Sequence, residues 1–435
     1  MRVHQRRTLF HDPGSHSNPF RLLLWGGLIV AGLYLLWGAE RGSIQPLFVA
    51  TPTATRGAVS YREEGSAFFE AGNLDKAILA YQDALAVNPE DHLGWGELAR
   101  IQTYSSALLT QDRQRTRLEE ALASADQAVA LAPEDSTGHA VRAFVLDWSA
   151  GAAGTAEEYQ AFIAEASTEA VLALQLDSLN VLALAYQAEV YADQQQYSQA
   201  SQYAERAMSL NPNSFDSLRV SAYVLEAAGN YAAAIERYKQ AAQVAPNQTF
   251  IYIRIGQNYR ELALYDQALE YFDRAASINE ALGIADPLPY IAIAKTYSRM
   301  GEFFAAALNA EKAVDLDPTN PDWYGQLGII YFRARNYESS IPVLRCAVGG
   351  CSDVQNSLDS VGRWVTPVSG LPLDNNTLVY YYTFGSVLAA LEQCDEALPV
   401  LDALSATYPG DAVVMLIVAE SYTICDGTVV SDGDG

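Results

Sequence analysis

The residue types best suited to catalysis or metal binding are scarce in this sequence. Three of its five histidines lie within the first 16 residues, and the other two are His92 and His139. Neither they nor the four cysteines show zinc-ligand spacing, and no Gly-rich phosphate loop or nucleophile elbow is present. Carboxylates are abundant, but charged runs on helix faces are usually just solvated. We therefore predict a protein that is not an enzyme and needs no metal or other cofactor.

Charge restricts the possible partners. The chain has 435 residues and a net charge of −25. Nucleic-acid binding requires clustered Lys and Arg, so we expect no nucleic-acid partner. Half of the residues are apolar, which allows either two or three globular domains or a stack of repeats. No small-molecule substrate is evident.

An uncharged apolar segment covers residues 22–39. As a helix it would span roughly 27 Å, close to the hydrocarbon core of a bilayer. Four arginines against one aspartate give residues 1–21 a net charge of +3, so this flank should stay in the cytoplasm and the acidic remainder should be exported. A cleaved signal peptide is the competing interpretation, but Trp37 makes a poor cleavage site. We predict a single-pass anchor in the cell (inner or cytoplasmic) membrane.

The anchor divides the chain into segments of different composition. Residues 1–21 form a basic cytoplasmic tail, and residues 40–57 form a Thr/Pro-rich linker with little to bury. The main body is predicted to cover residues 58–425. Residues 426–435 are expected to be a disordered tail.

A repeat with a unit of about 34 residues runs through the main body. If the proline that ends each unit is position 32, then Pro212 and Pro246 lie one 34-residue step apart. Positions 20 and 27 are then almost always Ala. Position 8 is always Ala or Gly, and its residues are Gly65, Ala99, Ala143, Ala188, Ala222, Gly256, Ala294, Gly328, Gly385 and Ala419.

Small residues at fixed positions allow paired helices to approach closely where they cross. This pattern closely resembles the tetratricopeptide repeat, and "WGELA" at residues 95–99 is similar to the opening of that family's unit. The resemblance implies an all-α, right-handed superhelical solenoid of helix-turn-helix units. About nine units and a capping helix should cover residues 58–425, with two longer units near the start.

The largest departure from the repeat is an insertion at residues 349–376. It is either a disordered segment or a folded loop that packs Trp364 and Val365 against the stack, and we slightly prefer the loop. The four cysteines all follow residue 345. In the repeat register Cys394 begins one helix and Cys425 ends the next helix at the same edge, so we predict a disulfide there and another between Cys346 and Cys351. Four buried free thiols are the alternative.

The resemblance also implies where a partner would bind. In this family the first helix of each unit lines a concave groove, and in the middle units that surface mixes apolar, aromatic and Arg side chains. The family's Lys/Asn carboxylate clamp is absent at the matching positions. Such a groove suits a peptide or helix, although its side chains are about equally suited to pairing with one another. The predicted contacts are Arg219, Tyr223, Phe250, Gln257, Arg260, Lys295 and Arg299.

We therefore predict a membrane-tethered scaffold or adaptor that binds another protein in its groove. A chaperone-like envelope-biogenesis factor that holds exported chains is an alternative, and the regulatory arm of an enzyme is a third. The sequence does not identify the partner, the pathway or the oligomeric state.

Overall fold

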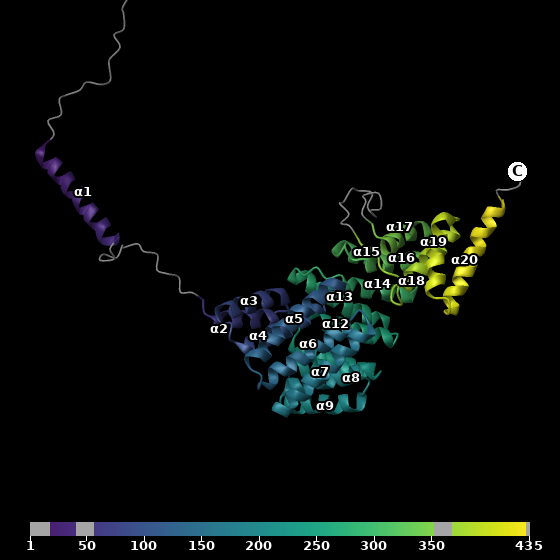
Figure 1. Ribbon diagram of the computed structural model, residues 1–435, viewed down its shortest axis with the longest axis horizontal. Helices are drawn as coiled ribbons and strands as arrows, with labels where there is room; N and C mark the ends of the chain where they lie inside the picture. Colours follow the sequence, from purple (N-terminus) through teal and green to yellow (C-terminus); the bar gives the residue numbers. More distant parts are fainter. Residues whose placement is uncertain (1–17, 41–55, 352–367, 432–435) are drawn as a thin grey trace, which may run out of the picture. The chain divides into compact units, whose positions relative to one another are not determined.

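The computed structural model describes residues 18–40, 56–351 and 368–431 (Figure 1). These residues form twenty helices and, apart from one isolated bridge between Cys351 and Val368, no β-structure. The all-α prediction is confirmed. The chain divides into two compact units, residues 1–56 and 57–435, and each is described by itself.

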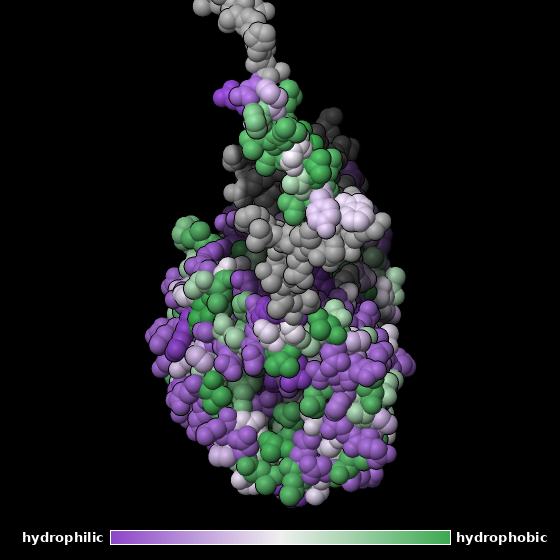
Figure 2. All heavy atoms as spheres, turned by 90° about the vertical axis from the view of Figure 1, so that its left-hand side faces the viewer, coloured by the Kyte–Doolittle hydropathy of each residue, from purple (hydrophilic) through white to green (hydrophobic). Residues whose placement is uncertain are grey.

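The first unit contains helix α1 (Pro19–Glu40). Its residues Pro19–Gly38 are long and apolar enough to cross a membrane, and an anchor and a signal sequence both fit such a helix near the N-terminus. Figure 2 shows that hydrophobic side chains dominate its surface. The predicted basic tail and linker lie almost wholly outside the described residues.

The second unit is a series of nine helical hairpins and a final helix, α20 (Ala412–Ser431). We call the first helix of each hairpin the A helix and the second the B helix. The A helices are α2 (Ala58–Glu70), α4 (His92–Ser106), α6 (Ser136–Gly151), α8 (Val181–Asp193), α10 (Phe215–Ala227), α12 (Thr249–Glu261), α14 (Leu288–Met300), α16 (Pro321–Arg333) and α18 (Leu378–Ala390). The B helices are α3 (Leu74–Val87), α5 (Gln111–Leu131), α7 (Ala156–Leu176), α9 (Tyr197–Leu210), α11 (Tyr231–Val244), α13 (Tyr265–Leu282), α15 (Phe303–Leu316), α17 (Tyr337–Gly349) and α19 (Cys394–Thr407).

Small residues occupy the crossings between the paired helices. Ala222 on α10 and Ala234 on α11 are completely buried. At Gly256 on α12, an added Cβ would lie 2.5 Å from Cε1 of Phe272 on α13. The close approach of A and B helices therefore depends on the missing side-chain volume at these positions.

In seven of the nine described hairpins, the turn between the A helix and its B helix contains one residue in the left-handed region. Glycine provides it at Gly72, Gly229 and Gly301, where φ is between 78° and 83°. Four other turns use a residue with a side chain at φ near 60°, and these are Gln195, Ala263, Arg335 and Glu392. The helix C-terminus thus selects the backbone conformation even where the sequence lacks glycine.

The departures from the regular repeat have structural counterparts. The second and third units are long because their B helices, α5 and α7, each run for 21 residues. Within the insertion, residues 352–367 lie outside the described part, which includes the predicted packing of Trp364 and Val365. Helix α20 continues to Ser431, whereas the sequence predicts a disordered tail from residue 426. Apolar residues from Ala412 onward can extend the helix beyond the repeat boundary.

Contacts between distant units close the first turn of the superhelix. The guanidinium of Arg113 on α5 lies 2.7 Å from the Asp317 carboxylate, 204 residues away. The side-chain amide of Gln248, just before α12, donates to the Phe69 carbonyl at 2.8 Å. The rings of Tyr104 on α4 and Phe250 on α12 stack with centroids 5.5 Å apart. These contacts bring the A helices of early and middle units around one enclosed space.

Gly256→Ala should lower the stability of the solenoid by about 1–3 kcal/mol, because the new methyl group overlaps the buried Phe272 ring. The measurement is the free energy of unfolding in denaturant. Gly96→Ala is the control, since nothing lies within 4 Å of a Cβ at that helical position. That control should be neutral or stabilise by up to about 1 kcal/mol. Equal losses in both variants would contradict the crossing argument.

The positions of the cysteines predict that a disulfide links the final helix, α20, to α19. Cα atoms of Cys394 and Cys425 lie 5.5 Å apart, and those of Cys346 and Cys351 lie 4.8 Å apart, both within the range that disulfides span. Because Cys394–Cys425 would close a loop of 31 residues, Cys394→Ser with Cys425→Ser should destabilise α20 by about 3–4 kcal/mol. Hydrogen exchange of the α20 amides measures this loss. The matched control is Cys346→Ser with Cys351→Ser, which should leave α20 protected.

Candidate functional site

A groove of about 540 Å³ lies among the A helices of the third to eighth units. Side chains from α6, α8, α10, α12, α14 and α16 line it, with smaller contributions from the α4–α5 region. Six of the seven predicted contact residues lie on its wall, and these are Arg219, Tyr223, Phe250, Gln257, Arg260 and Lys295. We describe its two ends and its apolar wall in turn.

A buried carboxylate lies on the same helix as Arg219 and Tyr223 of the groove wall. Asp216 on α10 accepts hydrogen bonds from the hydroxyl groups of Tyr104 and Tyr186, and lies 3.1 Å from Nη1 of Arg100. Burial alone would raise the pKa of Asp216, but Arg100 and the two hydroxyl groups outweigh it and lower the pKa. The carboxylate is therefore ionised at neutral pH and ties α4 and α8 to α10.

Arg219 belongs to this internal network. Its Nη1 and Nη2 donate to the two carboxylate oxygens of Glu189 on α8 at 2.6 and 2.5 Å. Its Nε donates to the hydroxyl of Tyr104 at 3.2 Å, and Trp148 also donates to Glu189. Only 4% of Arg219 is exposed. The sequence predicts this side chain as a partner contact, but its hydrogen-bonding capacity is already used within the protein.

The end of the groove near α6 and α8 is acidic. Asp147 on α6 is buried, and neither carboxyl oxygen has a hydrogen-bond partner among the described residues. Burial, with nearby Asp193 and Glu189, raises the pKa of Asp147 well above its usual range. Burial also raises the pKa of Asp193 to about 6, although the Tyr223 hydroxyl donates to it. We call Asp147 and Asp193 the acidic end.

Apolar side chains form the wall between the two ends. Phe250, Ile253 and Ile291 each line the groove while remaining less than 9% exposed. Gln257 on α12 is half-buried and also lines it. This wall suits an extended segment with apolar side chains, because such side chains gain free energy on leaving water.

The opposite end carries three hydrogen-bond donors from successive A helices. Nε and Nη1 of Arg260 on α12 and Nε1 of Trp323 on α16 are buried without a hydrogen-bond partner among the described residues. Lys295 on α14 lines the same groove. We call Arg260, Lys295 and Trp323 the donor end. Its unsatisfied donors distinguish it from the fully paired Arg219.

The remaining predicted contact, Arg299, is not part of the groove lining. Its Nη1 donates to the carboxylate of Glu261 at 3.3 Å, and its side chain is 45% exposed. An exposed ion pair of this kind contributes little free energy. The predicted set therefore divides into open groove residues, internally paired residues and this one surface residue.

Sequence reasoning missed Asp147, Glu189, Asp193 and Trp323. The first three occupy positions 12, 9 and 13 of their A helices, which are groove-facing positions in the repeat. That signal is present in the sequence, but the prediction draws only on the fifth to eighth units. Trp323 occupies position 3, outside those positions, so only the packing of α16 against its neighbours reveals it.

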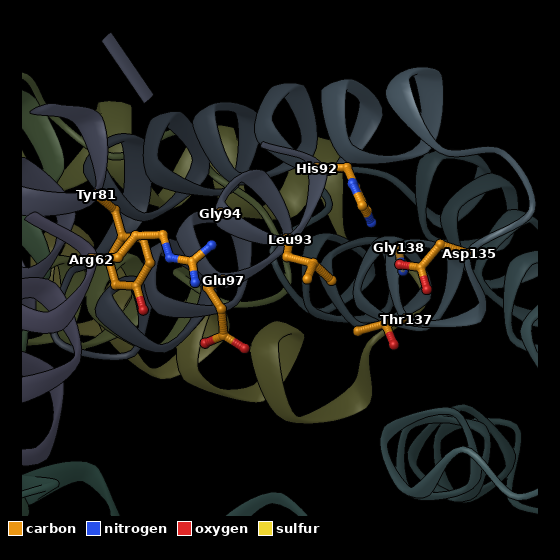
Figure 3. A pocket seen from close by; sticks show the side chains of 10 residues that line it. Arg62, Tyr81, His92, Leu93, Gly94, Glu97, Asp135, Thr137 and Gly138 are labelled. Carbon is orange, nitrogen blue, oxygen red and sulfur yellow. The ribbon is translucent and has the colours of Figure 1, made fainter. Parts of the chain in front are cut away.

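A second cavity of about 250 Å³ lies at the N-terminal ends of α4 and α6. Figure 3 shows Arg62, Tyr81 and Glu97 at one end of it, and His92, Asp135 and Thr137 at the other. Arg62 donates to Asp91 at 2.8 Å. This cavity is smaller and its principal cation is already paired, so we regard the groove as the candidate site. Within the described residues, no group of three or more His, Cys, Asp or Glu side chains is placed to hold a metal ion.

Comparison with known proteins agrees with the hairpin architecture. Two family models, both for the tetratricopeptide repeat, match this chain, one at residues 62–103, 186–249 and 291–353 and the other at residues 251–282. The chain is 28% identical over 131 residues to the BBSome complex member BBS4 of Bos taurus. That match covers 30% of this chain and 24% of the relative, so the chain spans about a quarter of the relative's length.

Two solved structures with similar helical arrangements differ in how much of each chain the match covers. A thermophilic tetratricopeptide-repeat protein of Thermus thermophilus has 19% identity and a TM-score of 0.38, covering 46% of this chain and 98% of that one. Yeast Tom70 has 17% identity and a TM-score of 0.41, covering 69% of this chain and 62% of that one. The family matches and the helical hairpins together show that this chain contains tetratricopeptide repeats.

Proposed function

We propose that the protein is a membrane-tethered scaffold that holds an extended segment of a partner protein in the groove between its A helices. Tetratricopeptide repeats generally serve protein–protein interaction, and such repeats match at four segments of this chain. The observation that carries the proposal is the groove itself. It combines an apolar wall with buried donors that have no partner within the described protein.

The geometry favours an extended segment over a helix. The groove has a volume of about 540 Å³ and is lined by side chains from six A helices. An α-helix with its side chains is about 10–12 Å across and needs a wide, continuous trough. An extended strand is slimmer and exposes its backbone to side-chain donors and acceptors such as Gln257.

Helix α1 supports tethering to a membrane. It is long and apolar enough to span the bilayer, and the flanking charges favour a cytoplasmic N-terminus with the solenoid outside the cytoplasm. The two cysteine pairs at disulfide distance suit an oxidising compartment. Tethering would restrict the scaffold to partners at the membrane surface.

The tether predicts stable membrane association of the whole chain. Full-length protein should remain in the membrane fraction after alkaline extraction, whereas a chain that starts at residue 41 and is made without α1 should be soluble. A reporter fused after Gly435 should be active only outside the cytoplasm. Release of the intact full-length chain, or a reporter active only in the cytoplasm, would contradict the proposed anchor or its orientation.

Site-specific crosslinking tests the scaffold function. A photo-crosslinking amino acid at Gln257, in the groove, should capture one or a few discrete proteins in intact membranes, through an extended segment identified by mass spectrometry. The control position is Gln267, which is exposed on α13 of the same unit. Adding Ile253→Arg should abolish capture from position 257 because the longer charged side chain fills the groove. Equal capture from both positions would refute the groove as the site, and a diffuse set of unfolded clients would favour the chaperone-like alternative.

A further inference from the structure

The donor end buries polar hydrogens that nothing in the described protein accepts. Nε and Nη1 of Arg260 and Nε1 of Trp323 are all buried and unpartnered. The nearest carboxylate oxygen recorded for Arg260, on Glu261, is 4.0 Å from Nε, beyond hydrogen-bonding distance. Native proteins satisfy most buried donors, so three such atoms around one groove indicate an acceptor that comes from outside the chain.

The other arginine in the groove shows that the fold can satisfy a guanidinium here. Arg219 donates to both oxygens of Glu189 and is fully enclosed. Arg260 instead has the face of the Phe272 ring, with Cζ 5.7 Å from the ring centroid, as its recorded stabilising contact. Burial lowers the pKa of Arg260, and the neighbouring Arg299 lowers it further. The protein therefore buries guanidinium donors of Arg260 without a hydrogen-bond acceptor, although Glu261 lies 4.0 Å away, and this costs stability.

Lys295 extends this positive region. Its side chain is exposed, but it opens into the groove rather than into bulk solvent. Burial lowers the pKa of Lys295, and Arg260 lowers it too, whereas Asp322 raises it. No hydrogen bond or ion pair of Lys295 with the described residues is recorded, in contrast to Lys312, whose Nζ lies 2.8 Å from Glu280.

The charge balance selects a singly charged anion. Arg260, Lys295 and Arg299 contribute three positive charges. Glu261, which lies beside Arg260 and Arg299, and Asp322, which accepts from the hydroxyl of Tyr380 at 2.5 Å, contribute two negative charges. The remaining net charge of about +1 matches one carboxylate and is too small for a phosphate dianion.

The surroundings indicate the kind of molecule that carries the carboxylate. Phe250, Ile253 and Ile291 adjoin the donor end, so neighbouring parts of the ligand must be apolar. We propose that Arg260, Lys295 and Trp323 form a carboxylate-binding subsite for an Asp or Glu side chain within an otherwise apolar, extended segment of the partner. This inference rests on the proposed scaffold function and specifies the partner's chemistry.

The first test needs no ligand. Arg260→Met removes buried donors that have no hydrogen-bond acceptor and supplies an apolar side chain, so the apparent melting temperature of the full chain should rise by roughly 2–4 °C. Arg219→Met is the matched control, and it should lower the melting temperature because it leaves Glu189 buried and unpaired. A melting temperature that falls equally in both variants would show that Arg260 is structurally satisfied and would overturn the proposal.

The second test measures carboxylate recognition directly in the detergent-solubilised full-length protein. The probe is the doubly capped pentapeptide acetyl-Leu-Ala-Glu-Ala-Leu-amide, and the signal is the indole N–H resonance of Trp323, assigned with Trp323→Phe. The Glu peptide should shift this resonance saturably as its carboxylate accepts the indole hydrogen. Arg260→Gln with Lys295→Gln should weaken the apparent affinity at least about tenfold, since hydrogen bonds to charged groups are the stronger class.

Three further peptides determine the specificity. The Gln peptide should give no shift at the same concentrations, and equal shifts with Glu and Gln would overturn carboxylate recognition. A phosphoserine peptide that binds more tightly than the Glu peptide would overturn the monoanion assignment. A peptide with Gln in place of Glu and a free C-terminus tests the terminal carboxylate, and its binding in preference to the Glu peptide would overturn the side-chain assignment.

The outcomes separate this proposal from the scaffold function. Discrete crosslinking at position 257 without any Glu-dependent shift would support the scaffold function and contradict the carboxylate-binding subsite. A Glu-dependent shift without crosslinking to any protein would support carboxylate binding at the donor end and contradict the proposed protein partner.

Discussion

The structure depends on one buried carboxylate. Asp216 receives two tyrosine hydroxyl groups and an arginine, which come from helices more than a hundred residues earlier and from the preceding unit. A buried charge is tolerated only when several groups compensate it, so these helices must converge on α10. The network therefore ties α4 and α8 to α10.

The two ends of the groove differ in how far their polar side chains are paired within the protein. Near α8, Glu189 and Arg219 satisfy each other and Trp148 donates a further hydrogen bond to Glu189. Near α14, Arg260 and Trp323 retain donors without a partner among the described side chains. The same fold thus uses polar residues in two ways. Paired groups set the shape of the groove, and unpaired groups supply its capacity for recognition.

The small residues that recur in each repeat explain why much of the fold could be predicted from the sequence. Gly256, Ala222 and Ala234 are small because helices cross there, and that demand recurs with every unit. Because small residues are needed at the same position of every unit, they form a periodic pattern within one sequence. The all-α array of hairpins could therefore be predicted. The left-handed turns at Gln195 and Ala263 could not be predicted in the same way. There the helix ends impose φ near 60° on residue types that do not usually adopt it.

The sequence by itself determined the helices, their pairing and the apolar N-terminal segment, since each follows from local periodicity, helix crossings or continuous hydropathy. It also placed Arg219, Gln257, Arg260 and Lys295 on groove-facing positions. Only the tertiary structure decided that Arg219 is paired with Glu189 while Arg260 is not, and that Asp147 and Trp323 share the same cavity. The physical reason is that charge compensation depends on distances between helices of different units. Superhelical curvature sets those distances, and no single repeat encodes that curvature.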